Sequence, residues 1–239
     1  MDKQLSTVVL IDEYPLFRKA MADLLTASGD FQVIGQTSDH ATALGLLALQ
    51  PDLIVMNLEQ EGMDTLQFLS DVKAHNPSIR VVMMMRHVDQ SSRLMRAIRG
   101  TADGYLLRTV SPPEFVDQLY KACHGGMAAS EKVTSALAEL LRKEQIDEES
   151  GTGGLFERLT RREFAVLCCL ASGDTNRDVA KRLEISEGTV KVHVKHVLKK
   201  LNFRSRVEVA VWATEHGYKL NDDGSVPPWD PMQTYHTGP

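Results

Sequence analysis

Three lysines and one valine share a helix face near the carboxyl end of the chain: Lys191, Val192, Lys195 and Lys199. The opposite side carries an apolar stripe that would enter a core, made of Val190, Val194, Val197, Leu198 and Leu201. A solvated face normally mixes both signs of charge, but the run from Val190 to Leu201 has four lysines, two histidines and no acid. Such a face suits a DNA major groove, where lysines reach phosphates or guanine edges and a valine methyl meets a thymine methyl. A basic surface helix is the alternative interpretation.

The preceding residues predict the elements that would position this face. Thr160 and Glu163 have the spacing of a capping box, so a helix is expected to begin at Thr160 and to stop at Gly173. A short second helix follows, capped by Thr175 or Asp174, and Ser186 caps the basic helix. Two short helices joined by a tight turn, the second one basic, form a helix-turn-helix. A fourth helix is expected at about 206–216.

This pattern resembles the LuxR-type four-helix DNA-binding domain of NarL/FixJ-family response regulators. The motifs are Leu159-Thr160-Arg161-Arg162-Glu163 and Gly188-Thr189-Val190-Lys191-Val192-His193. The resemblance implies that bases of double-stranded DNA are read by Lys191, Val192 and Lys195. Phosphate contacts are implied for Thr189, Lys199 and Arg206. The family also pairs two domains through the fourth helix, which implies a homodimer contact near Val207, Val211 and Trp212.

Residues 1–128 alternate short apolar runs with helical patterns. Strands are predicted at 7–11, 31–35, 53–56, 79–84 and 104–107, and helices at 15–28, 39–50, 65–75, 90–100 and 113–124. Five such units predict a five-stranded, parallel, doubly wound (flavodoxin-like) α/β domain. Functional groups are then expected at the carboxyl ends of the strands. Those ends carry Asp12, Glu13, Asn57, Arg86 and Arg108.

The same stretch resembles a response-regulator receiver domain, through Ile11-Asp12-Glu13, Pro51-Asp52-Leu53-Ile54-Val55-Met56-Asn57 and Ala102-Asp103-Gly104-Tyr105. In that family an aspartate after strand three accepts a phosphoryl group, assisted by magnesium on an acidic pair, a Ser or Thr and a Lys. Here Asn57 replaces the aspartate, Arg86 (or Met85) the hydroxyl residue, and Arg108 the lysine. A neutral amide is not a usable nucleophile and weakens a metal site.

Two explanations compete for Asn57: a deliberate substitution that blocks phosphorylation, and natural divergence of the pocket. Divergence is favoured because the other pocket positions differ as well. We expect Arg86 to lie near Asp12 and Glu13, taking the place of the magnesium ion. Input to such a degenerate receiver would come from an unknown ligand, a partner protein or concentration-driven dimerisation.

Composition limits the remaining classes of function. The net charge is -5, but residues 155–219 hold 13 Lys and Arg against 8 Asp and Glu, so attraction to nucleic acid belongs to that domain. No apolar run approaches membrane-spanning length and no signal peptide is evident, so a cytoplasmic protein is expected. Cys168 and Cys169 are expected in the core. No catalytic constellation, cofactor motif or metal site is expected, although His193 and His196 are three residues apart.

The remaining segments are expected to connect or extend these domains. Residues 129–154 would form a linker helix from Ser130 to Gln145 and a flexible acidic tether. Residues 155–219 form the DNA-binding domain, and residues 220–239 are expected to be disordered in isolation. The predicted function is a DNA-binding transcriptional regulator of the response-regulator type, not an enzyme. A protein-interaction adaptor, in which DNA binding is secondary, is the alternative.

Overall fold

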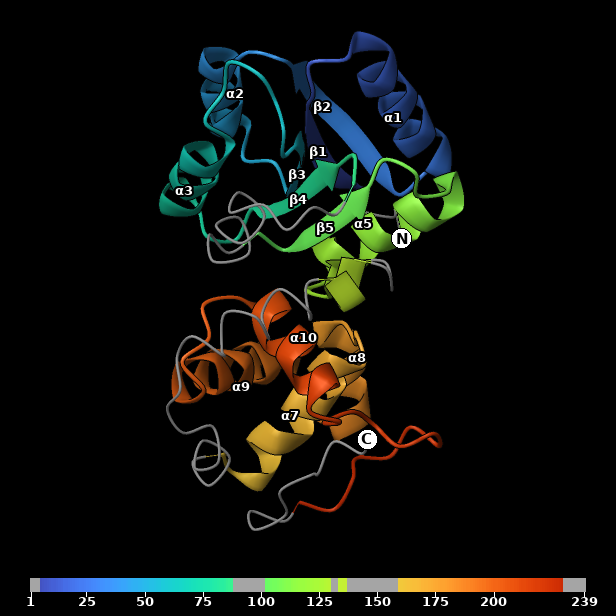
Figure 1. Ribbon diagram of the computed structural model, residues 1–239, viewed down its shortest axis with the longest axis vertical. Coiled ribbons are helices and arrows are strands. Elements are labelled where there is room, and N and C mark those ends of the chain that lie inside the picture. The colour runs from blue at the N-terminus through green and yellow to red at the C-terminus, as the bar shows by residue number, and fades with distance from the viewer. Residues whose placement is uncertain (1–4, 88–101, 130–132, 137–158, 230–239) are drawn as a thin grey trace. The chain divides into compact units, whose positions relative to one another are not determined.

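The chain forms two compact units, seen in a computed structural model that describes residues 5–87, 102–129, 133–136 and 159–229 (Figure 1). The first unit combines a sheet with helices, and the second is helical. The predicted succession of an α/β domain and an all-α domain is therefore confirmed. The expected helix at 90–100 and the acidic tether lie outside the described residues. So does the linker helix, apart from one helical turn at 133–136.

Six parallel strands form the sheet, in the order β2-β1-β3-β4-β5-β6. They are β1 (Ser6–Ile11), β2 (Phe31–Thr37), β3 (Leu53–Asn57), β4 (Arg80–Met85), β5 (Gly104–Leu107) and β6 (Ala128–Ala129). The predicted number of five was wrong, because β6 has only two residues and leaves no hydrophobic pattern to read. It pairs with the start of β5, where a Cβ on Gly104 would lie 2.4 Å from the Ala128 Cβ. Only glycine allows this close pairing.

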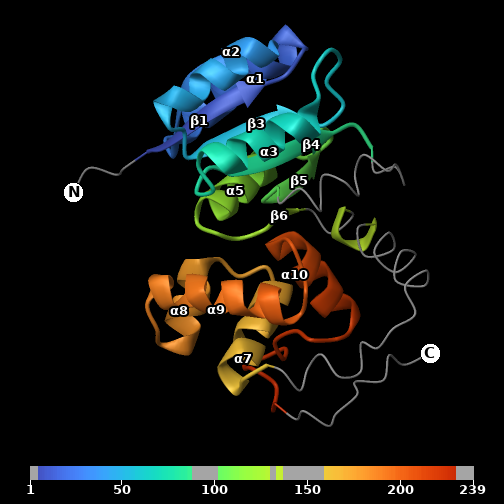
Figure 2. The same cartoon turned by 90° about the vertical axis from the view of Figure 1, so that its left-hand side faces the viewer.

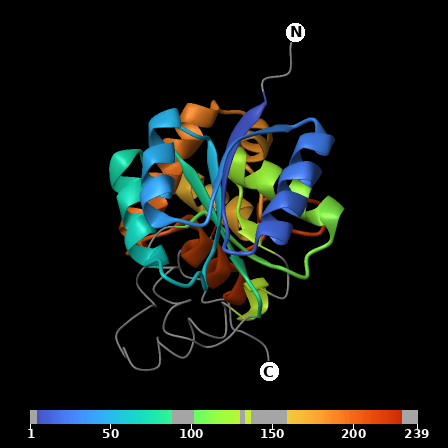
Figure 3. The same cartoon turned by 90° about the horizontal axis from the view of Figure 1, so that it is seen from above.

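Helices cover both faces of the sheet (Figure 3). Helices α1 (Pro15–Ser28) and α5 (Pro112–Cys123) lie on one face, and α2 (His40–Leu46) and α3 (Thr65–His75) lie on the other. A core of strand and helix residues fills the space under the first pair, including Leu10, Leu25, Leu106 and Leu119. This double covering requires strands that are apolar on both sides, which explains the continuous apolar runs of β3 and β4.

The helix predicted at 39–50 is divided in the structure. Helix α2 ends at Leu46 and continues as a single 3-10 turn, η1 (Leu47–Leu49). Gln50 then adopts a left-handed conformation with φ 48°, directly before Pro51. Because the residue before a proline avoids the α-helical region, the helix cannot extend to residue 50.

In the described part of the second unit, residues 159–229, four helices are present (Figure 2): α7 (Arg161–Ala171), α8 (Asn176–Leu183), α9 (Glu187–Lys200) and α10 (Arg206–Glu215). The predicted caps are present. Thr160 and Glu163 form a capping box, Thr175 caps α8, and the Ser186 hydroxyl accepts from the Thr189 N–H. Cys168 and Cys169 are fully buried, and burial raises the pKa of each thiol to about 12. Both cysteines are core residues, as predicted.

Residues 220–229 are ordered against the helical unit, and we call them the C-terminal strap. Leu220, Val226 and Trp229 pack on the core of this unit. A hydrogen-bonded turn links Asn221 and Ser225, whose backbone N···O distance is 2.9 Å. The prediction of disorder was therefore wrong for these residues, because a turn with three apolar contacts needs no periodic pattern. Residues 230–239 lie outside the described part of the chain.

Among the residues that the structure describes, no helix is both long enough and apolar enough to cross a membrane.

Candidate nucleic-acid interface and strand-end pocket

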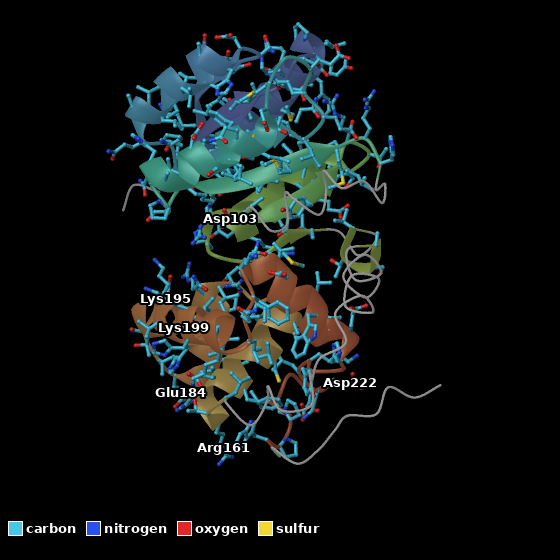
Figure 4. The ribbon with its side chains drawn as sticks, turned by 60° about the vertical axis from the view of Figure 1, so that its left-hand side comes forward. Asp103, Arg161, Glu184, Lys195, Lys199 and Asp222 are labelled. Atoms are coloured by element: carbon cyan, nitrogen blue, oxygen red, sulfur yellow. The ribbon has the colours of Figure 1, made fainter. Side chains whose placement is uncertain are left out.

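Helix α9 separates its two faces as predicted. Val190 and Val197 are fully buried, and Val194 and Leu198 pack half-buried against the same core. The side chains on the other face are exposed: Lys191, Val192, Lys195 and Lys199. Val192 retains 52% of its accessible surface. Lys195 and Lys199 project from the same side of the unit (Figure 4), so the exposed face presents separate cations around one apolar group.

The fourth lysine of this helix has a different role. The Lys200 Nζ lies 2.6 Å from a carboxylate oxygen of Glu163, the residue that also caps α7. The His196 Nδ1 lies 3.8 Å from the other oxygen of Glu163. Burial alone would raise the pKa of the Glu163 carboxyl, but hydrogen bonds from Lys200 and Thr160 outweigh it and hold the pKa below its usual value. Lys200 therefore ties α9 to α7 and leaves three lysines for a ligand.

Thr189 and Arg206 are already engaged within the unit. The Thr189 Oγ1 lies 2.8 Å from the Ser186 Oγ at the start of α9, and its side chain remains exposed. The Arg206 guanidinium donates to the Asn176 Oδ1 at 2.9 Å and to the Asp174 carbonyl. The predicted phosphate contact of Arg206 does not fit this arrangement. Its guanidinium instead joins the start of α10 to the start of α8.

The predicted contact residues on α10 divide into two groups. Trp212 belongs to the core of the unit, where it contacts the rings of Phe203 at 5.2 Å and His216 at 4.5 Å. Its indole thus stabilises the core of the unit, and its predicted place near a dimer contact stays a prediction. Val207 and Val211 are buried in the chain and lie one helical turn apart, on the side of α10 away from Ala213. Their role in a dimer stays a prediction.

The carboxyl ends of β1 and β5 meet in a buried ion pair. Asp12 follows β1 and is completely buried. Its Oδ2 accepts from the Arg108 Nη2 at 2.7 Å, and its Oδ1 accepts from the Tyr14 N–H at 2.8 Å. Burial raises the pKa of the Asp12 carboxyl, and the hydrogen bond from Tyr14 and the charge of Arg108 only partly oppose that rise. Both oxygens of this carboxylate are thus occupied by the protein itself.

Two aromatic rings flank the guanidinium of Arg108. Its central carbon lies 4.8 Å from the centre of the Tyr14 ring and 4.7 Å from that of Phe17. Both distances suit cation–π contacts. The planar guanidinium can lie against rings while donating to a carboxylate, which the ammonium of a lysine cannot do in the same way. Residue 108 is therefore held by three groups at once.

Glu13 and Asn57 complete the strand-end pocket. The Asn57 Nδ2 donates to the Glu13 Oε1 at 3.3 Å, and the Glu61 N–H donates to the Glu13 Oε2 at 3.1 Å. The Asn57 Oδ1 accepts from the Glu59 N–H at 3.1 Å. The amide thus serves both of its hydrogen-bonding functions within the pocket. An ionised aspartate at this position would instead repel Glu13.

Arg86 does not take the predicted position. Its Nε lies 2.6 Å from the Glu59 Oε2, and 58% of its side chain is exposed. The prediction that Arg86 would lie on Asp12 and Glu13 was wrong, because β4 ends at Met85 and Arg86 turns toward the loop after β3. Arg108 forms the charge-assisted pair with Asp12 instead.

The donor set does not fit the magnesium ion that a receiver of this family implies. Magnesium requires oxygen ligands in near-octahedral geometry with little tolerance. Here Arg108 and the Tyr14 N–H occupy Asp12, and position 57 contributes a neutral oxygen that accepts from Glu59. A metal ion would have to displace the Arg108 guanidinium.

The sequence placed the five pocket residues at one edge of the sheet, but it did not identify the partners of Arg108. Tyr14 and Phe17 are three residues apart at the start of α1 and therefore share one helix face. This aromatic pair, beside an arginine replacement at position 108, was the available signal. The Glu163 to Lys200 pair had no signal in the local pattern, because it joins residues on two different helices.

A parallel α/β unit with a strand-end acidic pair, followed by a helix-turn-helix unit, defines a DNA-binding regulator of the response-regulator class. The family described as "Response regulator receiver domain" matches residues 8–120, and "Bacterial regulatory proteins, luxR family" matches residues 157–213. The chain belongs to the NarL/FixJ-type response regulators. It is accordingly a DNA-binding response regulator of the LuxR family.

Individual relatives agree with this assignment over most of the chain. The nitrate/nitrite response regulator protein NarL of Escherichia coli K12 is 36% identical over 208 residues, covering 87% of this chain and 94% of that protein. The transcriptional regulatory protein LiaR of Bacillus subtilis is 32% identical, with coverages of 86% and 95%. A solved RcsB–DNA complex superposes with a TM-score of 0.52 at 19% identity, covering 88% and 99% of the two chains, and shares the fold.

Proposed function

We propose that this chain is a sequence-specific transcriptional regulator whose receiver operates independently of aspartyl phosphorylation. The observation that carries this proposal is the pairing of Arg108 with Asp12 in a pocket where Asn57 stands at the acceptor position. The pocket has no carboxylate at position 57, and the carboxylate of Asp12 already accepts hydrogen bonds from Arg108 and Tyr14. Control by phosphoryl transfer would require both changes to be undone.

On the DNA side, Lys191, Val192 and Lys195 are proposed to read bases, with Thr189 and Lys199 at phosphates. Their support is the exposed face of α9, which carries three cations and one apolar side chain; the one acid of this helix, Glu187, lies in its first turn. A recognition helix contacts base edges with residues of its first turns, which fits the position of these residues in α9.

We also propose that the bound form is a homodimer. Val207 and Val211 share one side of α10, while Val209, Trp212 and Ala213 belong to the core of the unit. Two domains related by a twofold axis would then read an inverted repeat, with half-sites about one helical turn of DNA apart, whereas a head-to-tail arrangement would read a direct repeat.

The pocket is tested by magnesium titration calorimetry and by incubation with a small phosphodonor. The unsubstituted protein should show no saturable magnesium binding at submillimolar concentrations and no phosphorylation. Asn57→Asp should remain weak, because Arg108 still occupies Asp12. The double variant Asn57→Asp/Arg108→Lys should bind magnesium at least about tenfold more tightly than Asn57→Asp alone.

Arg86→Ala is the matched control for this experiment, because Arg86 pairs with Glu59 and makes no contact with the Asp12–Arg108 pair that the structure records. It should leave magnesium binding unchanged. Micromolar magnesium binding by the unsubstituted protein that disappears in Asp12→Ala would contradict the proposal.

A further inference from the structure

The C-terminal strap lies beyond the part of the chain that the DNA-binding family accounts for. The family match ends at residue 213, and the strap begins at residue 220. Leu220, Val226 and Trp229 nevertheless pack on the core of the helical unit, and the Leu220 N–H donates to the Ser172 Oγ at 3.2 Å. In Figure 2 the segment runs beside α7, the first helix of the unit. The strap is thus an added part of the DNA-binding unit.

One arginine on α8 connects the strap to the helix-turn-helix. The Arg182 Nη1 donates to the Gly224 carbonyl at 2.6 Å, and its Nε donates to the Asp174 Oδ2 at 3.1 Å. Gly224 adopts φ +76°, a conformation that disfavours other residues, and a Cβ there would lie 3.0 Å from the Arg182 Nη1. A residue with a side chain at position 224 would therefore both strain the backbone and crowd the Arg182 guanidinium.

The strap and α7 together enclose the end of α8. They line a cavity of about 460 Å³, to which the start of α7 contributes Arg162, α8 contributes Leu183, and the strap contributes Val226 and Trp229. Leu183 is the last residue of α8, and its carbonyl accepts from the Arg162 Nη1 at 3.3 Å. The next residue, Glu184, holds the left-handed turn that leads into α9. Contacts at Arg182 and Leu183 thus fix the segment immediately before the recognition helix.

We infer that the C-terminal strap positions the recognition helix for base readout, with Arg182 as the positioning residue. This inference rests on the proposed sequence-specific DNA binding by α9. Base-edge contacts require side chains at fixed places, while attraction to phosphates tolerates small displacements. Loosening the strap therefore weakens binding to a specific site more than binding to random DNA.

Three full-length variants test this inference. Arg182→Lys keeps the charge but cannot make both hydrogen bonds, Gly224→Ala strains the turn, and Trp229→Ala removes the apolar anchor. Asp222→Ala is the control, because Asp222 lies in the same turn with an exposed side chain (Figure 4). Affinities are measured on a duplex selected in vitro and on random duplex, at a temperature where all proteins are fully folded.

Each test variant should lose about five- to tenfold in affinity for the selected duplex and less than about twofold for random duplex, with an unchanged salt slope. Asp222→Ala should match the unsubstituted protein on both. Unchanged selected-site affinity in the folded variants would overturn the inference, even if their melting temperatures fall, because the strap would then only stabilise the unit. Equal losses on both duplexes would overturn it as well.

Amide hydrogen exchange separates this inference from the proposed function, because it requires no DNA. Arg182→Lys and Trp229→Ala should accelerate exchange at the end of α8 and the start of α9, residues 183–190, relative to Asp222→Ala. Unchanged exchange there would contradict the positioning role. If the unsubstituted protein showed no preference for any duplex, the proposed function would fail, while the exchange result would still decide the strap's effect on α9.

Discussion

The Arg108 guanidinium lies against two aromatic rings and 2.7 Å from a fully buried carboxylate. At the scale of single residues, the Arg108 side chain fills the strand-end pocket and is held there by Asp12, Tyr14 and Phe17. A buried charge that loses its partner is costly, since the remaining charge has neither water nor a counterion. The stability of the α/β unit thus depends on this ion pair, and a substitution of Arg108 alone should destabilise the unit.

Replacing Arg108 by alanine should lower the free energy of unfolding by about 3 kcal/mol, because Asp12 would remain buried without its partner. Urea unfolding monitored by circular dichroism measures this change. Arg86→Ala removes an arginine that is largely exposed, and it should change the free energy of unfolding far less than Arg108→Ala does. Equal effects of the two substitutions would show that the Asp12–Arg108 pair contributes no more to stability than the exposed Arg86–Glu59 pair.

Two lysines of α9 should respond differently to substitution. Lys195→Ala should weaken binding to a selected duplex by about 1–3 kcal/mol, because Lys195 is proposed to reach a base, and should reduce the salt slope by about 1 because one cation is lost. Lys200→Met should mainly destabilise the helical unit, because it removes the partner of Glu163. Fluorescence anisotropy over a salt series measures the first effect and thermal unfolding the second. Identical profiles for the two variants would refute the division of roles.

Elements are joined in the helical unit by a few polar contacts between caps and neighbouring helices. Glu163 caps α7 and binds Lys200 at the end of α9, so one carboxylate fixes both the start of one helix and the end of another. The turn between α8 and α9 depends on Glu184, which holds φ 54°. Both features predict measurable changes in stability.

Acid should weaken the link between α7 and α9. The pKa of Glu163 is lower in the folded unit than in the unfolded chain, so its contribution to stability is present above the unfolded value, near 4.3, and is lost as the pH falls through the folded value. Glu163→Gln should reduce the dependence of stability on pH below about 5. Parallel stability curves for the two proteins over this range would contradict the assignment.

Glu184→Gly should stabilise the helical unit by up to about 1 kcal/mol, because the left-handed conformation costs a residue with a side chain more than it costs glycine. Thermal unfolding measures this gain. Glu187→Gly is the comparison, since it places glycine in the first turn of α9 and should destabilise the unit. A loss of stability in Glu184→Gly would mean that the Glu184 side chain makes a contribution beyond its backbone conformation.

The sequence predicted the elements better than the contacts between them. Local signals such as the Thr160 capping box and the apolar runs of the strands identified most described elements within a residue or two, because they depend on neighbours in sequence. The choice between Arg86 and Arg108 as the partner of Asp12 depends on where β4 ends and on the rings of α1, which no local pattern records. The strap was missed for the same reason.

For the whole molecule, charge and chemistry are divided between the two units. The basic residues concentrate in 155–219, while residues 1–128 hold 11 Lys and Arg against 15 Asp and Glu. DNA attraction therefore belongs to the helical unit, and the acidic remainder opposes indiscriminate binding. The strand-end pocket of the α/β unit is filled by the chain's own side chains, which supports the proposal that phosphoryl transfer is not the input. A ligand, a partner protein or the concentration of the chain itself would then set the response.

The most direct test is a DNA-binding titration of the untreated full-length protein at fixed salt, on a selected and on a random duplex, with and without a small phosphodonor and magnesium. We predict specific binding that is the same under both conditions, because under the proposed function the pocket would not accept a phosphoryl group. Specific binding that appears only after the phosphodonor and magnesium are added would contradict the account.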